Sequence, residues 1–199
     1  MRADLKLISD LVHPNSRLLD LGCGDGELLA ELKESKGVKG YGLDVDPNNI
    51  EKCLLKGVNV IEHDLDLGLD RFSSNSFQIV VMTETLQSVK APEQLLLEML
   101  RIGEECIVSF PNFGNWRCRI QLGRGRMPVS KHLPDSWFNT PNIHLCTCAD
   151  FEQLCNDLNI RILEKKYVNS EHEQSALIKI APNLLSSYAF YRLGRAQDV

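Results

Sequence analysis

Short apolar runs alternate along the first part of the chain with stretches in which apolar positions recur at helical spacing. Residues 17–23 (RLLDLGC) predict a buried strand, and residues 26–35, with Leu28, Leu29 and Leu32 on one face, predict the helix after it. We expect further strands at 39–46, 58–65, 77–86 and 105–112, and further helices at 47–57 and 92–103. This alternation predicts an α/β fold with a parallel sheet and helices on both faces, because parallel neighbours require a crossover connection.

The alternation stops after Pro111. Residues 113–149 contain Gly, Pro, Asn, Arg and both tryptophans of the chain without clear periodicity. Such a stretch is typical of an inserted segment rather than of a separate domain. A chain of 199 residues is long enough for one well-buried core and too short for two comfortable domains. We therefore expect a single domain over residues 1–199 that carries this insertion.

Regular patterning returns near the end of the chain. Residues 149–159 predict a helix, and residues 160–168 and 175–182 predict two strands. The short connection between these strands favours an antiparallel pair. Residues 193–199 contain nothing obvious to bury, and we expect them to fray.

Composition and charge narrow the class of protein. The net charge is -5 and the pI is about 5.6, so the chain has no overall field that attracts nucleic acid or an anionic membrane. We find no signal-peptide core, and no apolar run approaches the roughly 20 residues of a membrane span. The seven cysteines show no spacing typical of a disulfide framework. We expect a soluble, cytoplasmic protein with reduced thiols.

Three glycines follow one another at alternate positions between the first strand and the first helix, in Asp20 to Gly26 (DLGCGDG). A glycine-rich turn at this place lets the backbone approach a ligand and directs free helix N–H groups at it. The dinucleotide fingerprint G-x-G-x-x-G differs, because here the third glycine comes one position early. The negative charges of Asp20 and Asp25 suit a ligand with an ammonium or sulfonium group better than a pyrophosphate.

The motif DLGCGDG resembles the first motif of the class I S-adenosylmethionine-dependent methyltransferases. The resemblance implies a Rossmann-like, mostly parallel seven-stranded sheet with one antiparallel strand near an edge. It also implies S-adenosylmethionine or S-adenosylhomocysteine as ligand, with Asp44 on the ribose hydroxyls and Asp64 near the adenine amino group. Residues 82–89 (MTETLQSV) resemble the fourth motif, which closes the pocket near the methyl donor. The expected cofactor-binding residues are Asp20, Gly22, Cys23, Gly24, Gly26, Asp44, Val45, Asp64, Leu65 and Glu84.

Each of these features also has a simpler explanation. A glycine-rich turn alone can be a tight connection, and an aspartate at a strand end can be a helix cap. Their joint occurrence at the ends of several predicted strands favours a ligand site, since ligands of open α/β sheets bind at the carboxyl ends of the strands.

The residues for catalysis are less evident than those for cofactor binding. Methyl transfer needs an acceptor atom in line with the sulfonium and, for most oxygen and nitrogen acceptors, a group that takes a proton. The candidates for an acceptor site are Glu84, His132, Asp135 and His144. Residues 110–116 (FPNFGNW) are only loosely similar to the Asn/Asp-Pro-Pro-aromatic motif of amino-methyltransferases, and their order and spacing differ. The catalytic residues therefore remain unassigned, and whether the chain is an enzyme stays open.

His144, Cys146 and Cys148 (HLCTC) are spaced closely enough to raise the question of a zinc site. The sequence offers no CxxC partner for them, and buried thiols are the usual explanation for such cysteines. Cys23, within the glycine turn, is better explained by packing than as a nucleophile. We expect no metal.

Arginines and a tryptophan gather at the start of the insertion. Arg117, Arg119, Arg124 and Arg126 surround Trp116, which is compatible with a nucleic-acid patch, a protein contact surface or a solvated lid. Trp and Arg are favoured in protein interfaces, and no known RNA-binding module accompanies them, so we favour a protein partner over nucleic acid. The expected partner or acceptor surface consists of Trp116, Arg117, Arg119, Trp137 and His144.

A more specific resemblance covers residues 1–195. The methyltransferase motifs, together with 109–122 (SFPNFGNWRCRIQL), 125–130 (GRMPVS) and 133–147 (LPDSWFNTPNIHLCT), resemble the MetW family of methionine biosynthesis. This resemblance implies a protein that works beside homoserine O-acyltransferase, MetX, and it implies no known methyl acceptor.

Two functions therefore stay open. One is a partner protein that supports or activates O-acylhomoserine formation, and the other is a methyltransferase for an unidentified small molecule. Because S-adenosylmethionine is a downstream product of methionine, its binding could also tune the partner enzyme.

Overall fold

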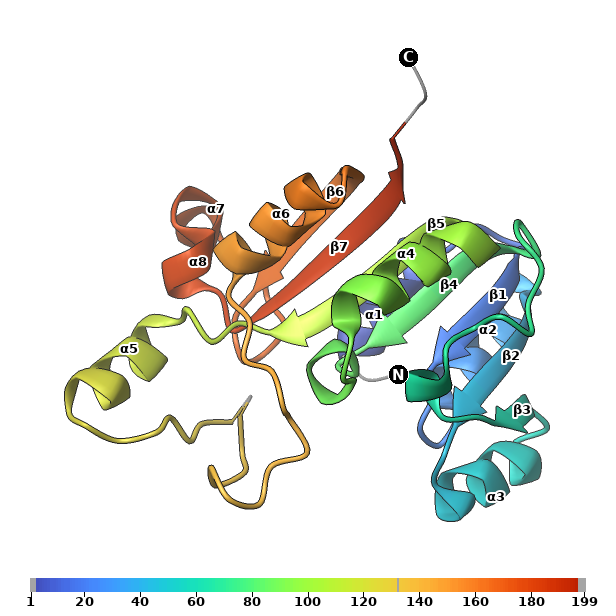
Figure 1. The fold of residues 1–199 in the computed structure, drawn as a ribbon, viewed down its shortest axis with the longest axis horizontal. Helices are drawn as coiled ribbons and strands as arrows, with labels where there is room; N and C mark the ends of the chain where they lie inside the picture. The colour runs from blue at the N-terminus through green and yellow to red at the C-terminus, as the bar shows by residue number, and fades with distance from the viewer. Residues whose placement is uncertain (1–2, 132, 197–199) are drawn as a thin grey trace.

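The computed structural model describes residues 3–131 and 133–196, and within them seven strands form one sheet in the order β3-β2-β1-β4-β5-β7-β6 (Figure 1). The strands are β1 (Arg17–Leu21), β2 (Lys39–Asp44), β3 (Asn59–Glu62), β4 (Phe77–Thr83), β5 (Gly103–Pro111), β6 (Ile160–Val168) and β7 (Tyr188–Arg195). Strands β1 to β5 pair in parallel, whereas β7 runs antiparallel to both of its neighbours, β5 and β6. The expected mostly parallel sheet with one antiparallel strand near an edge is confirmed.

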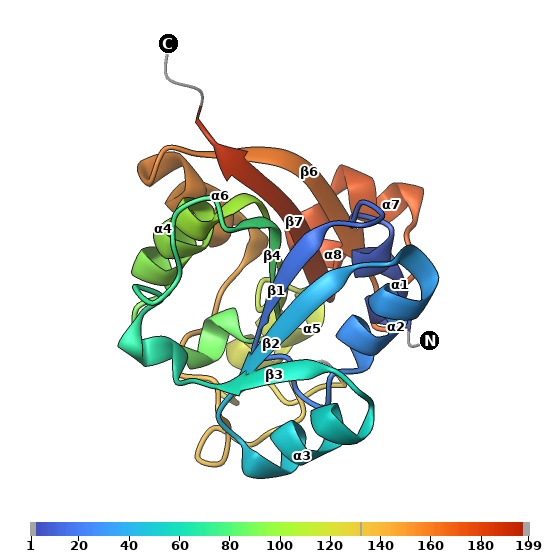
Figure 2. The ribbon, with the colours of Figure 1, turned by 90° about the vertical axis from the view of Figure 1, so that its right-hand side faces the viewer.

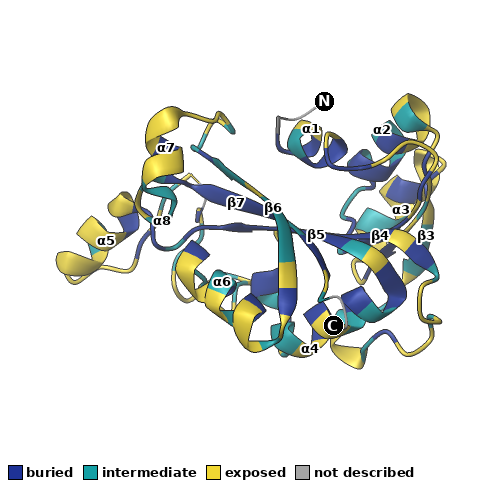
Figure 3. Ribbon diagram, turned by 90° about the horizontal axis from the view of Figure 1, so that it is seen from above, coloured by how far each residue is buried: buried dark blue, intermediate teal, exposed yellow. Residues whose placement is uncertain are grey.

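Helices cover the sheet on both faces, as the alternation in the sequence predicts. Figure 3 shows α1 (Ala3–Ser9) and α2 (Glu27–Lys36) on one face, and α4 (Pro92–Ile102) and α6 (Cys148–Asp157) on the other. Helix α3 (Pro47–Leu55) follows β2 and lies beside the edge strand β3 (Figure 2). Two short 3-10 helices, η1 (Leu65–Leu67) and η2 (Leu86–Ser88), follow β3 and β4.

The central strands are buried on both sides, and this explains their continuous apolar sequences. In β1, Leu18 packs with Ile8 and Leu32 in one core cluster, and the next residue, Leu19, packs with Leu96 and Met99 in the other. The four-residue run 79–82 in β4 divides in the same way between the two clusters. A core on each face fixes the register, which brings the carboxyl ends of β1, β2 and β4 together.

The prediction of a strand at 175–182 is wrong. These residues form α7 (Ala176–Ile180) and the start of α8 (Pro182–Leu185). Ser175 caps α7, because its hydroxyl accepts a hydrogen bond from the backbone N–H of Ile178 at 3.3 Å, and Pro182 occupies the first turn of α8. The antiparallel partner of β6 is β7, which begins six residues beyond Pro182.

The prediction that residues 193–199 fray is wrong for the described part of this segment. Leu193 is fully buried within β7. The guanidinium group of Arg195 donates to the carbonyl oxygens of Leu100 at 2.6 Å and Gly103 at 2.9 Å. Residues 197–199 lie outside the described residues.

Two helices have no counterpart in the sequence analysis. Helix α1 contributes Leu5 and Ile8 to the core. Helix α5 (Trp116–Gly123) lies within the insertion, and Asn115 caps it by accepting a hydrogen bond from the backbone N–H of Arg117 at 3.0 Å. The rest of the insertion runs beyond the carboxyl end of β5 with little regular structure before α6 (Figure 1).

Candidate functional site

The glycine turn after β1 adopts a backbone conformation that disfavours other residues. Gly22, Gly24 and Gly26 have φ values of 72°, 55° and 75°, in the left-handed region. A Cβ atom on Gly22 would lie 2.5 Å from the Thr85 hydroxyl, and one on Gly26 would lie 2.8 Å from the Cys53 sulfur. A Cβ atom on Gly24 would meet nothing within 4 Å. The first and third glycines are thus packed against neighbours, and the middle one borders open space.

Hydrogen bonds fix this turn to the end of β2. The backbone N–H groups of Gly22 and Cys23 both donate to the carbonyl oxygen of Leu43, at 2.9 and 3.0 Å. The N–H of Gly24 donates to Asp44 Oδ2 at 2.8 Å. These bonds hold the turn against the end of its neighbour strand.

Asp44 is a buried carboxylate that accepts several hydrogen bonds. Its Oδ1 accepts from the backbone N–H of Asp46 at 2.9 Å and from Asn49 Nδ2 at 3.3 Å, in addition to the Gly24 bond on Oδ2. A carboxylate offers about four acceptor positions, so the group retains capacity for a ligand hydroxyl. It also connects the glycine turn with the start of α3.

Asp20, at the end of β1, is more deeply buried. Its side chain is 2% exposed, and Oδ1 makes no hydrogen bond to the described residues. Burial, together with the neighbouring charge of Asp44, raises the pKa of Asp20 to about 7. A buried carboxyl oxygen without a partner is costly, and a ligand cation beside it would remove that cost.

Two hollows open at the carboxyl ends of the parallel strands, with volumes of about 370 and 460 Å³. They share Gly22, Gly24 and Asn49, so they form the two halves of one groove that passes over the glycine turn. The expected cofactor residues in the first half are Asp20, Gly22, Cys23 and Gly24, and those in the second half are Gly22, Gly24, Asp44, Val45, Asp64 and Leu65.

Gly26 and Glu84 do not line the groove, although the sequence analysis expects both there. Gly26 is instead the N-cap residue directly before α2, and it packs on Cys53. Glu84 is exposed and has a φ of 51°, and its backbone N–H donates to the carbonyl oxygen of Ser109 at 2.9 Å. It lies between two residues that do line the groove, Thr83 and Thr85.

The groove also contains residues that the sequence analysis does not assign to it. Thr85 and Ser88 belong to the motif at 82–89, so that motif indicated their position. Asn49 comes from the first turn of α3. Pro141 comes from the insertion, and no feature of the sequence connects it with the glycine turn.

The residues considered for a metal do not converge. His144 Nε2 lies 3.3 Å from the Lys90 carbonyl oxygen, Cys146 donates to the Thr147 carbonyl oxygen, and Cys148 Sγ lies 3.6 Å from the Ser186 hydroxyl. Burial raises the pKa of Cys146 to about 12, which disfavours a thiolate. Over 3–131 and 133–196 we find no group of three or more His, Cys, Asp or Glu side chains placed to hold a metal ion.

The other candidates for an acceptor or partner lie away from the groove. Trp116 is partly exposed, and the guanidinium group of Arg117 stacks 5.3 Å from the centre of its ring. Arg119 donates from Nε to the Gly114 carbonyl oxygen at 2.7 Å. Trp137 and Asp135 line a separate small hollow of about 140 Å³. His132 lies outside the described residues.

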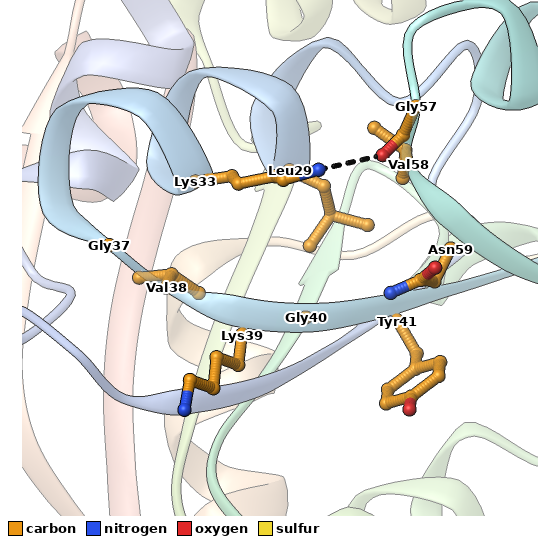
Figure 4. Close-up of a pocket in the computed structure, with 10 residues that line it drawn as sticks. All are labelled: Leu29, Lys33, Gly37, Val38, Lys39, Gly40, Tyr41, Gly57, Val58 and Asn59. Atoms are coloured by element: carbon orange, nitrogen blue, oxygen red, sulfur yellow. Dashed lines mark hydrogen bonds between the residues drawn. The ribbon is translucent and has the colours of Figure 1, made fainter.

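A further hollow of about 400 Å³ lies beside the opposite ends of β2 and β3. Figure 4 shows Lys33 above β2, where its ammonium group donates to the Gly57 carbonyl oxygen at 2.9 Å. Lys39 and Tyr41 point to the other side of the strand (Figure 4). The two ammonium groups therefore do not converge on a common point, in contrast to the polar groups around the glycine turn.

The fold is that of the class I S-adenosylmethionine-dependent methyltransferases. An S-adenosylmethionine-dependent methyltransferase from Archaeoglobus fulgidus has a similar structure, with a TM-score of 0.71 and 16% sequence identity over 96% of this chain and 91% of that one. A second, from Mesorhizobium loti, has a TM-score of 0.70 and 16% identity over 97% and 98%.

The chain belongs to the MetW family. The family model described as methionine biosynthesis protein MetW matches residues 2–193. The chain is also 34% identical over 208 residues to the bifunctional methionine biosynthesis protein MetXA/MetW of Rhodopirellula baltica. That alignment covers 98% of this chain and 33% of the relative, so the chain spans about a third of the length of that curated relative. In the part of the chain that the structure describes, no helix is both long and apolar enough to cross a membrane.

Proposed function

We propose that this protein binds S-adenosylmethionine or S-adenosylhomocysteine in the groove over the glycine turn, and that it acts with homoserine O-acyltransferase, MetX, to support or activate O-acylhomoserine formation. The observation that carries the first part is the buried Asp20 carboxyl, which has an unpartnered oxygen and borders the groove. The relative named MetXA/MetW supports the second part, because one polypeptide carries both names.

The charges of the groove match the ligand. The ligand's α-ammonium group and, in S-adenosylmethionine, its sulfonium group are cations that suit the Asp20 end of the groove. Asp44 accepts a ribose hydroxyl at its remaining acceptor position, and Asp64, in the same half of the groove, accepts from the adenine amino group. Gly24 borders open space and permits close approach of the ligand to the backbone.

The alternative function, methyl transfer to a small molecule, is supported by the fold alone. Among the candidate proton acceptors that the structure describes, Glu84 and His144 do not line the groove, and Asp135 lines a separate hollow. A group within hydrogen-bond reach of an acceptor is the minimum for general base catalysis. We therefore favour the partner function.

Ligand binding is tested by titrating S-adenosylhomocysteine into the protein in a calorimeter. Asp44→Ala removes charge-assisted hydrogen bonds, each contributing about 1.5–3 kcal/mol, so the affinity should fall at least tenfold. Asp70→Ala is the matched control, since it removes one exposed carboxylate outside the groove. An Asp44→Ala variant that melts normally and binds as tightly as the control would show that the groove is assigned wrongly.

Partner function is tested by the rate of the acyltransferase from the same organism, with and without this protein, and by co-elution in size exclusion. We expect a complex and a changed rate. Trp116→Ala combined with Arg119→Ala should weaken the complex and leave ligand affinity unchanged, because neither side chain lines the groove. The absence of both a complex and a rate change would favour a free-standing methyltransferase.

A further inference from the structure

The insertion exposes an unusual amount of apolar surface. Half of the exposed large hydrophobic side chains among the described residues belong to 113–149, which is less than a fifth of the chain. We call them the apolar surface: Trp116, Ile120, Leu122, Met127, Val129, Trp137, Phe138, Ile143 and Leu145. Trp137 and Phe138 are the most exposed of these, at 72% and 74%, and their rings meet edge to face at 5.6 Å. Concentrations of this kind usually mark a protein contact.

The charge around the apolar surface indicates the chemistry of its partner. Residues 113–149 contain four arginines and Lys131 against a single acidic residue, Asp135, in a chain whose net charge is -5. The occupant that fits is a protein with an acidic rim around an apolar centre, since complementary potentials guide association. We identify this partner as the acyltransferase of the proposed function, because the relative named MetXA/MetW joins the two names in one chain.

One short segment borders both the groove and the apolar surface. We call residues 137–145 the strap. Pro141 lines the groove together with Thr85 and Ser88. Its neighbours Thr140 and Asn142 instead line the small hollow of the apolar surface. The strap therefore presents one side to the ligand groove and the other to the partner.

The strap is held against the wall of the groove at its carboxyl-terminal half. The backbone N–H groups of Ile143 and His144 both donate to the carbonyl oxygen of Gln87, at 2.9 and 3.0 Å. The Ser88 hydroxyl donates to Asn142 Oδ1 at 3.5 Å. Gln87 and Ser88 belong to η2, which follows directly on Thr85 of the groove wall. A ligand that contacts Thr85 and Ser88 restrains the segment that holds the strap. A ligand that contacts Pro141 restrains the strap directly.

We infer that the strap couples the two sites, so that a ligand in the groove strengthens the binding of the acyltransferase to the apolar surface. This inference rests on the proposed function. The physical reason is preorganisation: a strap already restrained by ligand loses less conformational freedom when the partner binds. Linkage requires that the partner strengthen ligand binding by the same factor.

The test measures the dissociation constant of the complex with and without saturating S-adenosylhomocysteine, and that of S-adenosylhomocysteine with and without the acyltransferase. In the unmodified protein we expect both constants to fall by the same factor, on the order of tenfold. In Pro141→Gly, which removes from the groove wall the ring through which the ligand contacts the strap, we expect this factor to approach one. The coupling factor is a ratio of two dissociation constants of the same variant, so it can be compared between variants even where Pro141→Gly, a change in the groove wall, alters the separate affinities.

The matched control is Pro134→Gly, an exposed proline in the same insertion that lines neither hollow and lies outside the strap. It should keep the full coupling factor. Equal factors in Pro141→Gly and Pro134→Gly would overturn the role of the strap. A complex whose affinity is unchanged or weakened by bound ligand would overturn the coupling and leave the proposed function intact, whereas failure of either molecule to bind would overturn the proposed function itself.

Discussion

The groove over the glycine turn and the apolar surface of the insertion differ in almost every physical respect. The groove carries polar groups, most densely in its Asp20 half, the backbone of its glycine turn is fixed by bonds to Leu43 and Asp44, and it stands on strands buried from both faces. The apolar surface is built from exposed side chains, most of them on irregular backbone. A small ligand is recognised by backbone geometry and a few buried charges, whereas a protein partner is recognised by side chains that gain most when another surface covers them.

The largest expected difference between the groove and the apolar surface is the pH dependence of stability that Asp20 contributes. The pKa of Asp20 is about 7 in the folded protein, against an ordinary value of 3.8. Between pH 4 and pH 7 the carboxyl group is therefore protonated in the folded state and ionised in the unfolded state. Stability should therefore be greatest below pH 4 for this group and should fall as pH rises to 7, by about 4 kcal/mol in total. Denaturant titrations at several pH values give the unfolding free energy of the unmodified protein and of Asp20→Asn. The change with pH in the difference between these two free energies measures the loss.

The Asn side chain has the same shape and no charge, so the difference between the two proteins cancels the titration of all other carboxyl groups. Saturating S-adenosylhomocysteine should reduce the loss of stability between pH 4 and pH 7, because the ligand's ammonium group stabilises the ionised carboxylate of Asp20. A difference between the two proteins that stays constant from pH 4 to 7 would show that Asp20 is ionised throughout.

Alanine at two glycines of the turn separates packing from ligand access. Gly22→Ala combines a left-handed backbone with a clash against Thr85 and should cost about 2–4 kcal/mol of unfolding free energy. Gly24→Ala has the same backbone cost of about 1–2 kcal/mol without the clash, and its methyl group should instead obstruct the ligand. Chemical denaturation and titration with S-adenosylhomocysteine report the two effects, and equal stability losses would contradict the packing argument.

The smallest effect on stability is expected on the apolar surface. Trp137→Ala together with Phe138→Ala should change the unfolding free energy by no more than about 0.5 kcal/mol per site, because both side chains are mostly exposed. The same pair should weaken acyltransferase binding by at least about 2 kcal/mol, or roughly thirtyfold. Leu55→Ala, equally exposed but on α3, is the control that should affect neither quantity. A large loss of stability would mean that the aromatic pair serves the fold.

The fold could be predicted where the sequence pattern is local. Strands such as β4 are apolar along their length because both faces are buried, and helices such as α4 carry a clear apolar face. The apolar residues of 175–182 are compatible with a strand, but the cap at Ser175 and the proline at 182 favour helices. The strand that pairs with β6, β7, begins with aromatic residues typical of strands, and only its second half, with Gly194 and two arginines, interrupts that signal.

The candidate site likewise has a part that the sequence predicts and a part that it does not. The turn from Asp20 to Gly26 is contiguous, and its motif could be recognised from the order of its residues alone. Pro141 reaches the groove only because the insertion folds back against η2, through backbone bonds to Gln87. Such contacts depend on carbonyl groups, which every residue has, so no side-chain pattern could have revealed them.

The position of β7 has a consequence for the order in which the protein is made. Strand β7 follows the other six described strands in the sequence, yet it lies between β5 and β6, and among the described strands it connects β6 to the rest of the sheet. During synthesis, β5 and β6 leave the ribosome before the strand that joins them. Until then both strands present unpaired edges, which are a known route to aggregation. A nascent chain of this protein therefore completes its sheet only when β7 has emerged.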